Sequence, residues 1–216
     1  IFKDENVNAL RSQLSWTHYR ELLTLNNINE IKYYIKIAET QNLSYRKLRK
    51  RIKSREYERL DDKTKEKLIN KEKINAGDLI NDPILIRNKF DTDKISEKML
   101  MSFILEDIPS FLKQLGEGFT FIENEYPIKI GDRYNYIDIL LYNIYDNCYV
   151  VIELKINEIK KEHIGQIETY MNFIDKNLRT VNQGPTIGII VCKKKNGYLF
   201  KYVTNEKIYE REYKLV

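Results

Sequence analysis

The sequence predicts a mixed α/β protein in which a small all-helical segment precedes a core of helix, three strands, helix and strand. Apolar residues recur at helical spacing before residue 60, and β-like runs separated by short turns dominate after residue 118. A helical pattern between two of these runs indicates a crossover connection, which adds a parallel strand to an otherwise antiparallel sheet.

Three short helices are predicted at the N-terminal end. The first spans Trp16 to Leu23 with Ser15 as its N-cap, and the second spans Ile28 to Gln41. The third begins after its N-cap Ser44 and places Tyr45, Leu48 and Ile52 on one apolar face. Three short helices that end in a basic helix resemble a helix-turn-helix or winged-helix reader.

The third helix carries a basic face with no acid between Ser44 and Arg55. Most charge runs are solvated surface, but these usually mix both signs, whereas a face of one sign is the electrostatic footprint of a nucleic-acid contact. The candidate nucleic-acid-binding residues are Arg46, Lys47, Arg49, Lys50 and Lys53.

Composition sets the broad class. The chain has 216 residues, a net charge of +5 and 42% hydrophobic residues, which excludes a wholly disordered chain. Residues 1–76 hold 18 Lys and Arg against 11 Asp and Glu, whereas the remaining 140 residues hold 19 against 21. The basic part is therefore the one suited to a polyanion.

Cellular context is inferred from the apolar runs and the cysteines. None of the apolar runs in the sequence approaches the roughly 20 residues that a bilayer span needs, and Cys148 and Cys192 lie in β-like runs without a CxxC partner. We expect buried, reduced thiols and a soluble cytoplasmic protein. Because the chain starts with Ile1 rather than Met, we expect it to be a piece of a longer protein.

The expected domains are a helical nucleic-acid- or partner-binding domain at 1–76, a linker at 77–94 and an α/β domain at 95–216. Pro83 disfavours helix at Asp82, which supports the linker. A helix from Ser96 to Leu115 should end at Gly116 and bend or break at Pro109.

The expected strands and the second core helix follow. The strands are FTFIENEYPIKI, RYNYIDILLY and CYVVIELKI, then TIGIIVC after a helix from Lys160 to Phe173, with further strands through YLFKYV and IYEREYKL. In RYNYIDILLY, alternation sends Ile137, Ile139 and Leu141 to one face and Asp138 to the other.

The stretch YVVIELKIN places two charges inside an apolar strand. Alternation sends Val150, Ile152 and Leu154 to one face, while Glu153 and Lys155 share the other. If the strands of Asp138 and Glu153 form a hairpin, these carboxylates come close together. At about 4 Å they would repel by ~4 kcal/mol at an effective dielectric of ~20, which favours a bound cation.

Hard oxygen ligands suit Mg²⁺ or Mn²⁺, and a lysine beside them can orient a water and stabilise charge on a phosphate. Asp138, Glu153 and Lys155 therefore form a candidate phosphodiester-cleaving site. The alternative is that all three are ordinary charges on the wet face of an antiparallel sheet, since an isolated ExK tripeptide is common.

The following helix adds polar candidates. Gln166 and Tyr170 are four residues apart and so lie on one helix face, where they could reach the same cleft, although a polar surface pair is the usual reading. His163 has no second histidine near it in sequence, so a surface or helix-start residue is expected there rather than a metal ligand.

Several of these motifs together resemble the YhcG family of PD-(D/E)XK nuclease-like proteins. The resemblance rests on YIDILLYN, YVVIELKINEIKKEHIGQIETYMNFID and PTIGIIVCKKKN, and on the N-terminal stretches LSWTHYRELL and AETQNLSYRKLRKRI. It implies a restriction-endonuclease-like core (αβββαβ) that cuts nucleic acid with a divalent metal.

The resemblance also implies site residues. It assigns Asp138, Glu153 and Lys155 to the nuclease motif, Gln166 and Tyr170 to a QxxxY element, and Glu106 to the acid of the first core helix. The implied metal ligands are Asp138, Glu153 and Glu106, with an exposed helical acid as the alternative for Glu106. Family relatives tend to carry a glutamine where this chain has Glu125, which leaves the metal count and the substrate preference open. A homodimer and a partner from a restriction or defence system are also implied.

Three functions remain open at this point. The first is a divalent-metal-dependent nuclease, acting on DNA, whose basic N-terminal domain captures substrate or a partner. The second is a non-catalytic nucleic-acid- or protein-binding subunit of a restriction or defence complex that retains the nuclease fold as a scaffold. The third is a structural subunit whose first domain mediates assembly. The complete set of two acids and a lysine favours the nuclease.

Overall fold

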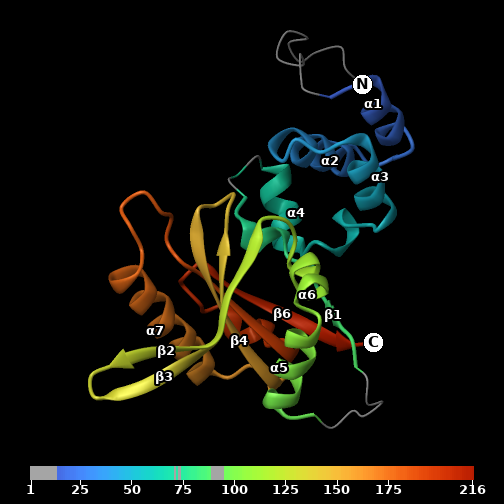
Figure 1. Ribbon diagram of the computed structural model, residues 1–216. Coiled ribbons are helices and arrows are strands. Elements are labelled where there is room, and N and C mark those ends of the chain that lie inside the picture. The colour runs from blue at the N-terminus through green and yellow to red at the C-terminus, as the bar shows by residue number, and fades with distance from the viewer. Residues whose placement is uncertain (1–13, 71, 73, 89–94) are drawn as a thin grey trace. The chain divides into compact units, whose positions relative to one another are not determined.

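A computed structural model of the chain describes residues 14–70, 72, 74–88 and 95–216 (Figure 1). The chain divides into two compact units, residues 1–73 and residues 74–216. None of the described helices has the length and apolar content needed to cross a bilayer.

The first unit is helical where it is described. Its elements are α1 (Trp16–Leu22), α2 (Ile28–Thr40), α3 (Tyr45–Lys53), the 3₁₀ turn η1 (Tyr57–Arg59) and α4 (Asp62–Ile69). Ser15 and Ser44 are the N-caps of α1 and α3, and the Ser44 Oγ accepts from the Lys47 backbone N–H at 3.4 Å. Residues 14–70 contain no strand, so the β-wing of a winged helix is not found among them.

The second unit is a six-stranded mixed sheet with helices on both faces (Figure 1). The strand order is β1-β6-β5-β4-β3-β2. The elements in chain order are η2 (Ala76–Leu79), β1 (Ile84–Ile86), α5 (Glu97–Glu106), α6 (Ile108–Leu115), β2 (Phe119–Ile130), β3 (Arg133–Asn143), β4 (Cys148–Glu158), α7 (Lys161–Asn177), β5 (Ile187–Lys194), α8 (Gly197–Phe200) and β6 (Ile208–Leu215). The observed α/β sheet agrees with the expected αβββαβ core.

The helix break expected at Pro109 is present. α5 ends at Glu106, and Asp107 caps α6 by accepting from the Ser110 backbone N–H at 3.1 Å. Pro109 then lies in the first turn of α6, where its missing N–H costs no helical hydrogen bond.

Two segments differ from expectation. Residues 77–94 were expected to be a linker, but η2 and β1 lie there, and β1 pairs in parallel with β6 at the edge of the sheet. A strand of three residues leaves too little periodicity to detect. The strand expected at YLFKYV is wrong, because Asn196 caps α8 by accepting from the Leu199 backbone N–H at 3.1 Å.

Two apolar clusters sandwich the sheet. The residues of α5 and α6 pack with Val150, Ile152 and Leu154 of β4, while α7 packs with Val151 of the same strand. Alternation along β4 therefore holds, and both of its faces are buried. Cys148 and Cys192 lie inside these clusters as free thiols, as expected.

Alternation along β3 holds only in part. Ile139 and Leu141 pack on the α5 side as expected, but Ile137 lies in the cluster that α7 covers. The β2–β3 ladder shifts register between Phe121 and Glu123, and Glu125 of β2 has φ 49, a left-handed conformation. Ile137 lies beyond Ile139, the last residue of β3 that pairs with β4, so it is outside the part of the sheet for which the predicted faces hold.

Candidate active site

The sheet forks at Asp138 and Glu153. β3 pairs with β4 from Asn143 back to Ile139, opposite Ile152, whereas β3 continues beside β2 down to Arg133 and β4 continues beside β5 to Glu158. The two strands therefore part immediately after the pair Ile139 and Ile152, and the β2–β3 hairpin projects on from that point (Figure 1). The next residues on each side are the two predicted acids.

Asp138 occupies the apex of this fork. Its Oδ2 accepts from the backbone N–H of Leu154 at 2.7 Å, so a side-chain oxygen takes the place of a strand carbonyl where the ladder ends. Burial raises the pKa of Asp138, while the bond from Leu154 and the charge of Lys155 act in the opposite direction.

Glu153 is the most buried of the predicted site acids, at 2% exposed. Its Oε1 accepts from Lys155 Nζ at 2.8 Å, while its Oε2 is buried without a hydrogen-bond partner among the described residues. Burial and then the charge of Asp138 raise the pKa of Glu153 to about 7, against the lowering effect of Lys155. A wet sheet face does not account for such a carboxylate.

Lys155 lies between two carboxylates. Its Nζ is 2.8 Å from Glu153 Oε1 and 3.4 Å from Glu97 Oε2. Burial acts to lower the pKa of Lys155, but the hydrogen bond and charge of Glu153 outweigh burial, and the pKa is raised. Lys155 therefore stays an ammonium at neutral pH.

α7 brings Gln166 and Tyr170 to the same region. The Gln166 Nε2 donates to the Tyr170 Oη at 2.9 Å, as their spacing predicted. Burial raises the pKa of Tyr170, and the charges of Glu153 and Asp138 add to the effect, which shows that the ring lies within electrostatic reach of both acids. His163 accepts from the Lys160 backbone N–H at 3.2 Å and so belongs to the helix start, as expected.

Glu106 does not join this group. It is exposed at the last position of α5, whereas Glu97 at the first position contacts Lys155. Nine residues of helix separate them, which is roughly 13 Å. The acid on the first core helix that reaches the fork is Glu97, and the sequence interpretation missed it because an acid after the N-cap Ser96 is typical of helix capping.

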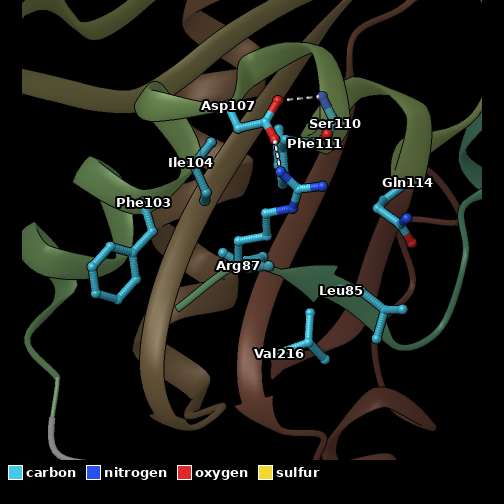
Figure 2. A pocket seen from close by; sticks show the side chains of 10 residues that line it. Leu85, Arg87, Phe103, Ile104, Asp107, Ser110, Phe111, Gln114 and Val216 are labelled. Carbon is cyan, nitrogen blue, oxygen red and sulfur yellow. Dashed lines mark hydrogen bonds and ion pairs between the residues drawn. The ribbon is translucent and has the colours of Figure 1, made fainter. Parts of the chain in front are cut away.

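The end of α5 near Glu106 lies beside a different feature. A cavity of about 220 Å³ opens there, and the Asp107 carboxylate pairs with Arg87 at 3.5 Å across its polar side (Figure 2). Ser110 and Gln114 also line the cavity, and its other lining residues are apolar, including Phe103 and Leu85. Because none of the predicted catalytic side chains lines this cavity, it is separate from the fork.

The fork offers two carboxylates that could hold a metal ion. Among the described residues, no three His, Cys, Asp or Glu side chains are gathered closely enough to hold a metal by themselves, so the structure does not bring the predicted ligands Asp138, Glu153 and Glu106 together in one group. Asp138 and Glu153 nevertheless offer two carboxylates, one with an unpartnered buried oxygen, and such a pair suits a hard cation that takes its other ligands from water and phosphate.

The basic helix is divided between two roles. Arg46, Lys47, Lys50 and Lys53 are exposed on α3. Arg49 instead makes a bidentate pair with Glu21 of α1, at 2.8 and 2.6 Å. Four of the five predicted basic side chains are thus exposed and could contact a polyanion. The fifth, Arg49, forms an ion pair between α3 and α1.

The second unit is a nuclease-like domain of the PD-(D/E)XK type. Its mixed sheet is flanked by helices, two of its strands part at a fork, and two acids and a lysine lie together there. The family model of the YhcG PDDEXK nuclease domain matches residues 78–215, and that of the DUF1016 N-terminal domain matches residues 1–59. The chain belongs to the YhcG PDDEXK nuclease family.

A curated relative of this chain is distant in sequence. The protein named "Putative nuclease YhcG" of Escherichia coli (strain K12) is 23% identical over 197 residues, which cover 88% of this chain and 52% of the relative. The chain thus spans about half the length of that relative.

Similar solved structures are also distant in sequence. A repair endonuclease from Pyrococcus abyssi has a TM-score of 0.42 at 23% identity, covering 55% of this chain and 47% of that one. EndoMS in complex with double-stranded DNA has a TM-score of 0.42 at 18% identity, covering 58% and 48%.

Proposed function

We propose that this chain is a divalent-metal-dependent nuclease that hydrolyses phosphodiester bonds of DNA at the fork between β3 and β4. The observation that carries the proposal is Glu153, a carboxylate that is 2% exposed, lies beside Asp138 and has one oxygen without a partner among the described residues. Burying two acids together destabilises both as anions, and a divalent cation relieves that cost.

Each residue then has a distinct task. Asp138 and Glu153 would hold Mg²⁺ or Mn²⁺, and Leu154 fixes the Asp138 carboxylate through its backbone N–H. A bound ion of this kind supplies Lewis-acid polarisation of the phosphate and acidifies its bound water. Lys155, an ammonium held by Glu153, stabilises the negative charge that develops on the phosphate oxygens.

Gln166, Tyr170 and Glu97 support these groups. The hydrogen bond between Gln166 and Tyr170 orders the α7 side of the fork. Glu97 holds the Lys155 ammonium from the α5 side, at 3.4 Å. The exposed lysines and arginine of α3 would capture the DNA backbone through phosphate contacts, which makes binding salt-dependent.

The test is cleavage of plasmid, linear and single-stranded DNA with Mg²⁺ or Mn²⁺. Glu153→Gln and Lys155→Met should each lower the rate by at least about 100-fold, because each removes a group from the site of charge development. Glu97→Gln should have a smaller effect, and Glu106→Gln on the same helix should match the wild type.

Equal rates in all five proteins would contradict the site assignment. Absence of cleavage on every substrate, together with salt-dependent DNA binding that the α3 lysines control, would instead favour a non-catalytic binding subunit. The exposed basic face of α3 is the observation that keeps this second function under test.

A further inference from the structure

A basic groove with exposed aromatic rings lies at the carboxyl ends of β4 and β5. Its volume is about 460 Å³, and Glu158, Lys194, Tyr198 and Lys201 are among the residues that line it. We refer to it as the lysine–tyrosine groove. Ligands of sheets with parallel strands commonly bind at this end of the strands.

Tyr198 lines this groove, and Tyr202 follows the lining residue Lys201 in the sequence; both rings are highly exposed. Tyr198 is 83% exposed and Tyr202 is 84% exposed. The Lys201 ammonium lies 5.5 Å from the centroid of the Tyr198 ring, and the Lys194 side chain is 71% exposed while it pairs with Glu158 at 3.3 Å. In proteins that bind single strands, exposed aromatic rings stack on nucleobases and neighbouring basic side chains contact phosphates.

The base of the groove is held rigidly. Lys195 Nζ pairs with Asp82 at 2.5 Å, and the Asn196 side chain donates to the Ile159 carbonyl at 3.4 Å. The Asn196 backbone N–H donates to Glu210 at 3.0 Å. Lys195 therefore serves the fold, and Lys194 and Lys201 remain for a ligand.

The groove continues the candidate active site along one strand. Glu153, Lys155 and Glu158 all belong to β4, and Glu158 lines the groove. Lys155 and Glu158 pair with Cys192 and Lys194 of β5, which are two residues apart, so the two positions are separated by roughly 7 Å along the sheet. The groove would therefore receive nucleotides close to the scissile phosphate.

We propose that the lysine–tyrosine groove binds a single-stranded segment of the polynucleotide substrate, with bases stacked on Tyr198 and Tyr202 and phosphates at Lys194 and Lys201. The proposal rests on the proposed function for its placement beside a cleavage site. Duplex DNA hides the base faces that tyrosine rings would stack on, so the groove favours unpaired nucleotides.

The test measures binding without cleavage. A fluorescent ten-nucleotide single-stranded DNA is titrated with the full chain carrying Glu153→Gln, in EDTA, and the anisotropy is followed at several salt concentrations. Tyr198→Ala and Tyr202→Ala should each weaken binding about fivefold or more, whereas Tyr198→Phe should keep the affinity, because stacking needs only the ring.

The charged residues give effects of opposite sign. Lys194→Ala combined with Lys201→Ala should lower the slope of log affinity against log salt by about 0.7 per lysine. Glu158→Gln should raise the affinity, because it removes an anion from the groove and releases Lys194. Tyr145→Ala and Lys176→Ala change residues of the same types outside the groove and should leave binding unchanged.

Unchanged affinity and salt slope in all the groove variants would overturn the proposal and leave the proposed nuclease function intact. Tighter binding of a ten-base-pair duplex through the same residues would overturn it as well. A parallel titration with RNA of the same sequence compares the affinity for the two kinds of backbone. Weaker binding of either the DNA or the RNA strand by the groove variants would support the proposal. If the wild type cleaves none of the substrates while the groove variants still lose affinity, the proposed nuclease function is contradicted and the proposed binding of single strands in the groove is supported.

Discussion

Glu153 combines features that seldom occur together in one side chain. It is 2% exposed, it lies beside a second acid, and its Oε2 has no partner within the described part of the chain. Among the described residues, Lys155 offsets the burial, with its Nζ at 2.8 Å from the other oxygen, Oε1. Such an arrangement costs stability unless a cation completes it, which is why we assign it a function.

The raised pKa of Glu153 predicts how stability depends on pH. Its ordinary value is 4.5 and its folded value is about 7, so both states are protonated below pH 4.5. Between pH 4.5 and 7 the unfolded chain releases the proton more readily, and the folded state becomes progressively less stable; above pH 7 the cost is complete. Glu153→Gln removes this dependence.

Urea unfolding in EDTA at a series of pH values measures the effect. The free energy of unfolding of Glu153→Gln, relative to wild type, should rise by about 3 kcal/mol between pH 4.5 and 8, since one pKa unit corresponds to about 1.4 kcal/mol. A difference between the two proteins that stays constant over this range would contradict a buried Glu153 with a raised pKa.

Single residues also show how far the sequence can predict the site. Asp138, Glu153 and Lys155 were found from strand alternation and the family resemblance, and the structure brings them together at the fork. Glu97 was not found, because its contact with Lys155 joins residues 58 positions apart through the packing of α5 on the sheet. Spacing along one helix cannot report such a contact.

At the scale of elements, the packing of α7 on β5 decides where Gln166 and Tyr170 lie. Gly188 in β5 leaves no room for a side chain: a Cβ there would lie 2.5 Å from the Met171 Sδ and 3.1 Å from Ile167 Cδ1. The absence of a side chain at this position lets α7 approach the sheet closely, and the QxxxY pair with it.

Gly188→Ala should therefore lower the free energy of unfolding by about 1–3 kcal/mol, the usual cost of overpacking a core. Gly165→Ala in α7 is the control, because a Cβ there meets nothing within 4 Å, and it should be neutral or slightly stabilising. Adding Met171→Ala to Gly188→Ala should recover part of the loss in a double-mutant cycle. Strictly additive losses would show that the two side chains do not compete for space.

The long strands and main helices were predictable because their patterns are long. β2 occupies Phe119–Ile130, the stretch that alternation and the Gly131 turn indicate. The short elements were not predictable: β1 has three residues and α8 has four, and local caps and edge pairing define both of them. Ile137 shows a further limit, since it lies beyond Ile139, where the pairing of β3 with β4 ends.

At the scale of the whole molecule, the two compact units differ in charge, and the basic one carries the exposed face of α3. Lys47→Ala combined with Lys50→Ala should weaken duplex DNA binding and lower its salt slope by about 0.9 per lysine, without a change in melting temperature. Arg49→Ala should instead lower the melting temperature, because it breaks the pair with Glu21. Anisotropy and thermal unfolding of the same samples separate the two outcomes, and an unchanged salt slope in the double variant would exclude α3 as the DNA contact.

The fork between β3 and β4 is the site of the proposed function. Asp138 and Glu153 account there for the buried charge, for the end of the strand ladder and for the proposed chemistry. Isothermal titration of Mg²⁺ into the full chain at pH 8 tests most directly whether Asp138 and Glu153 hold a divalent cation. Wild type and Glu106→Gln should bind the ion alike, and Glu153→Gln should lose the binding heat. Equal heats in all three proteins, or no heat in any of them, would contradict the assignment.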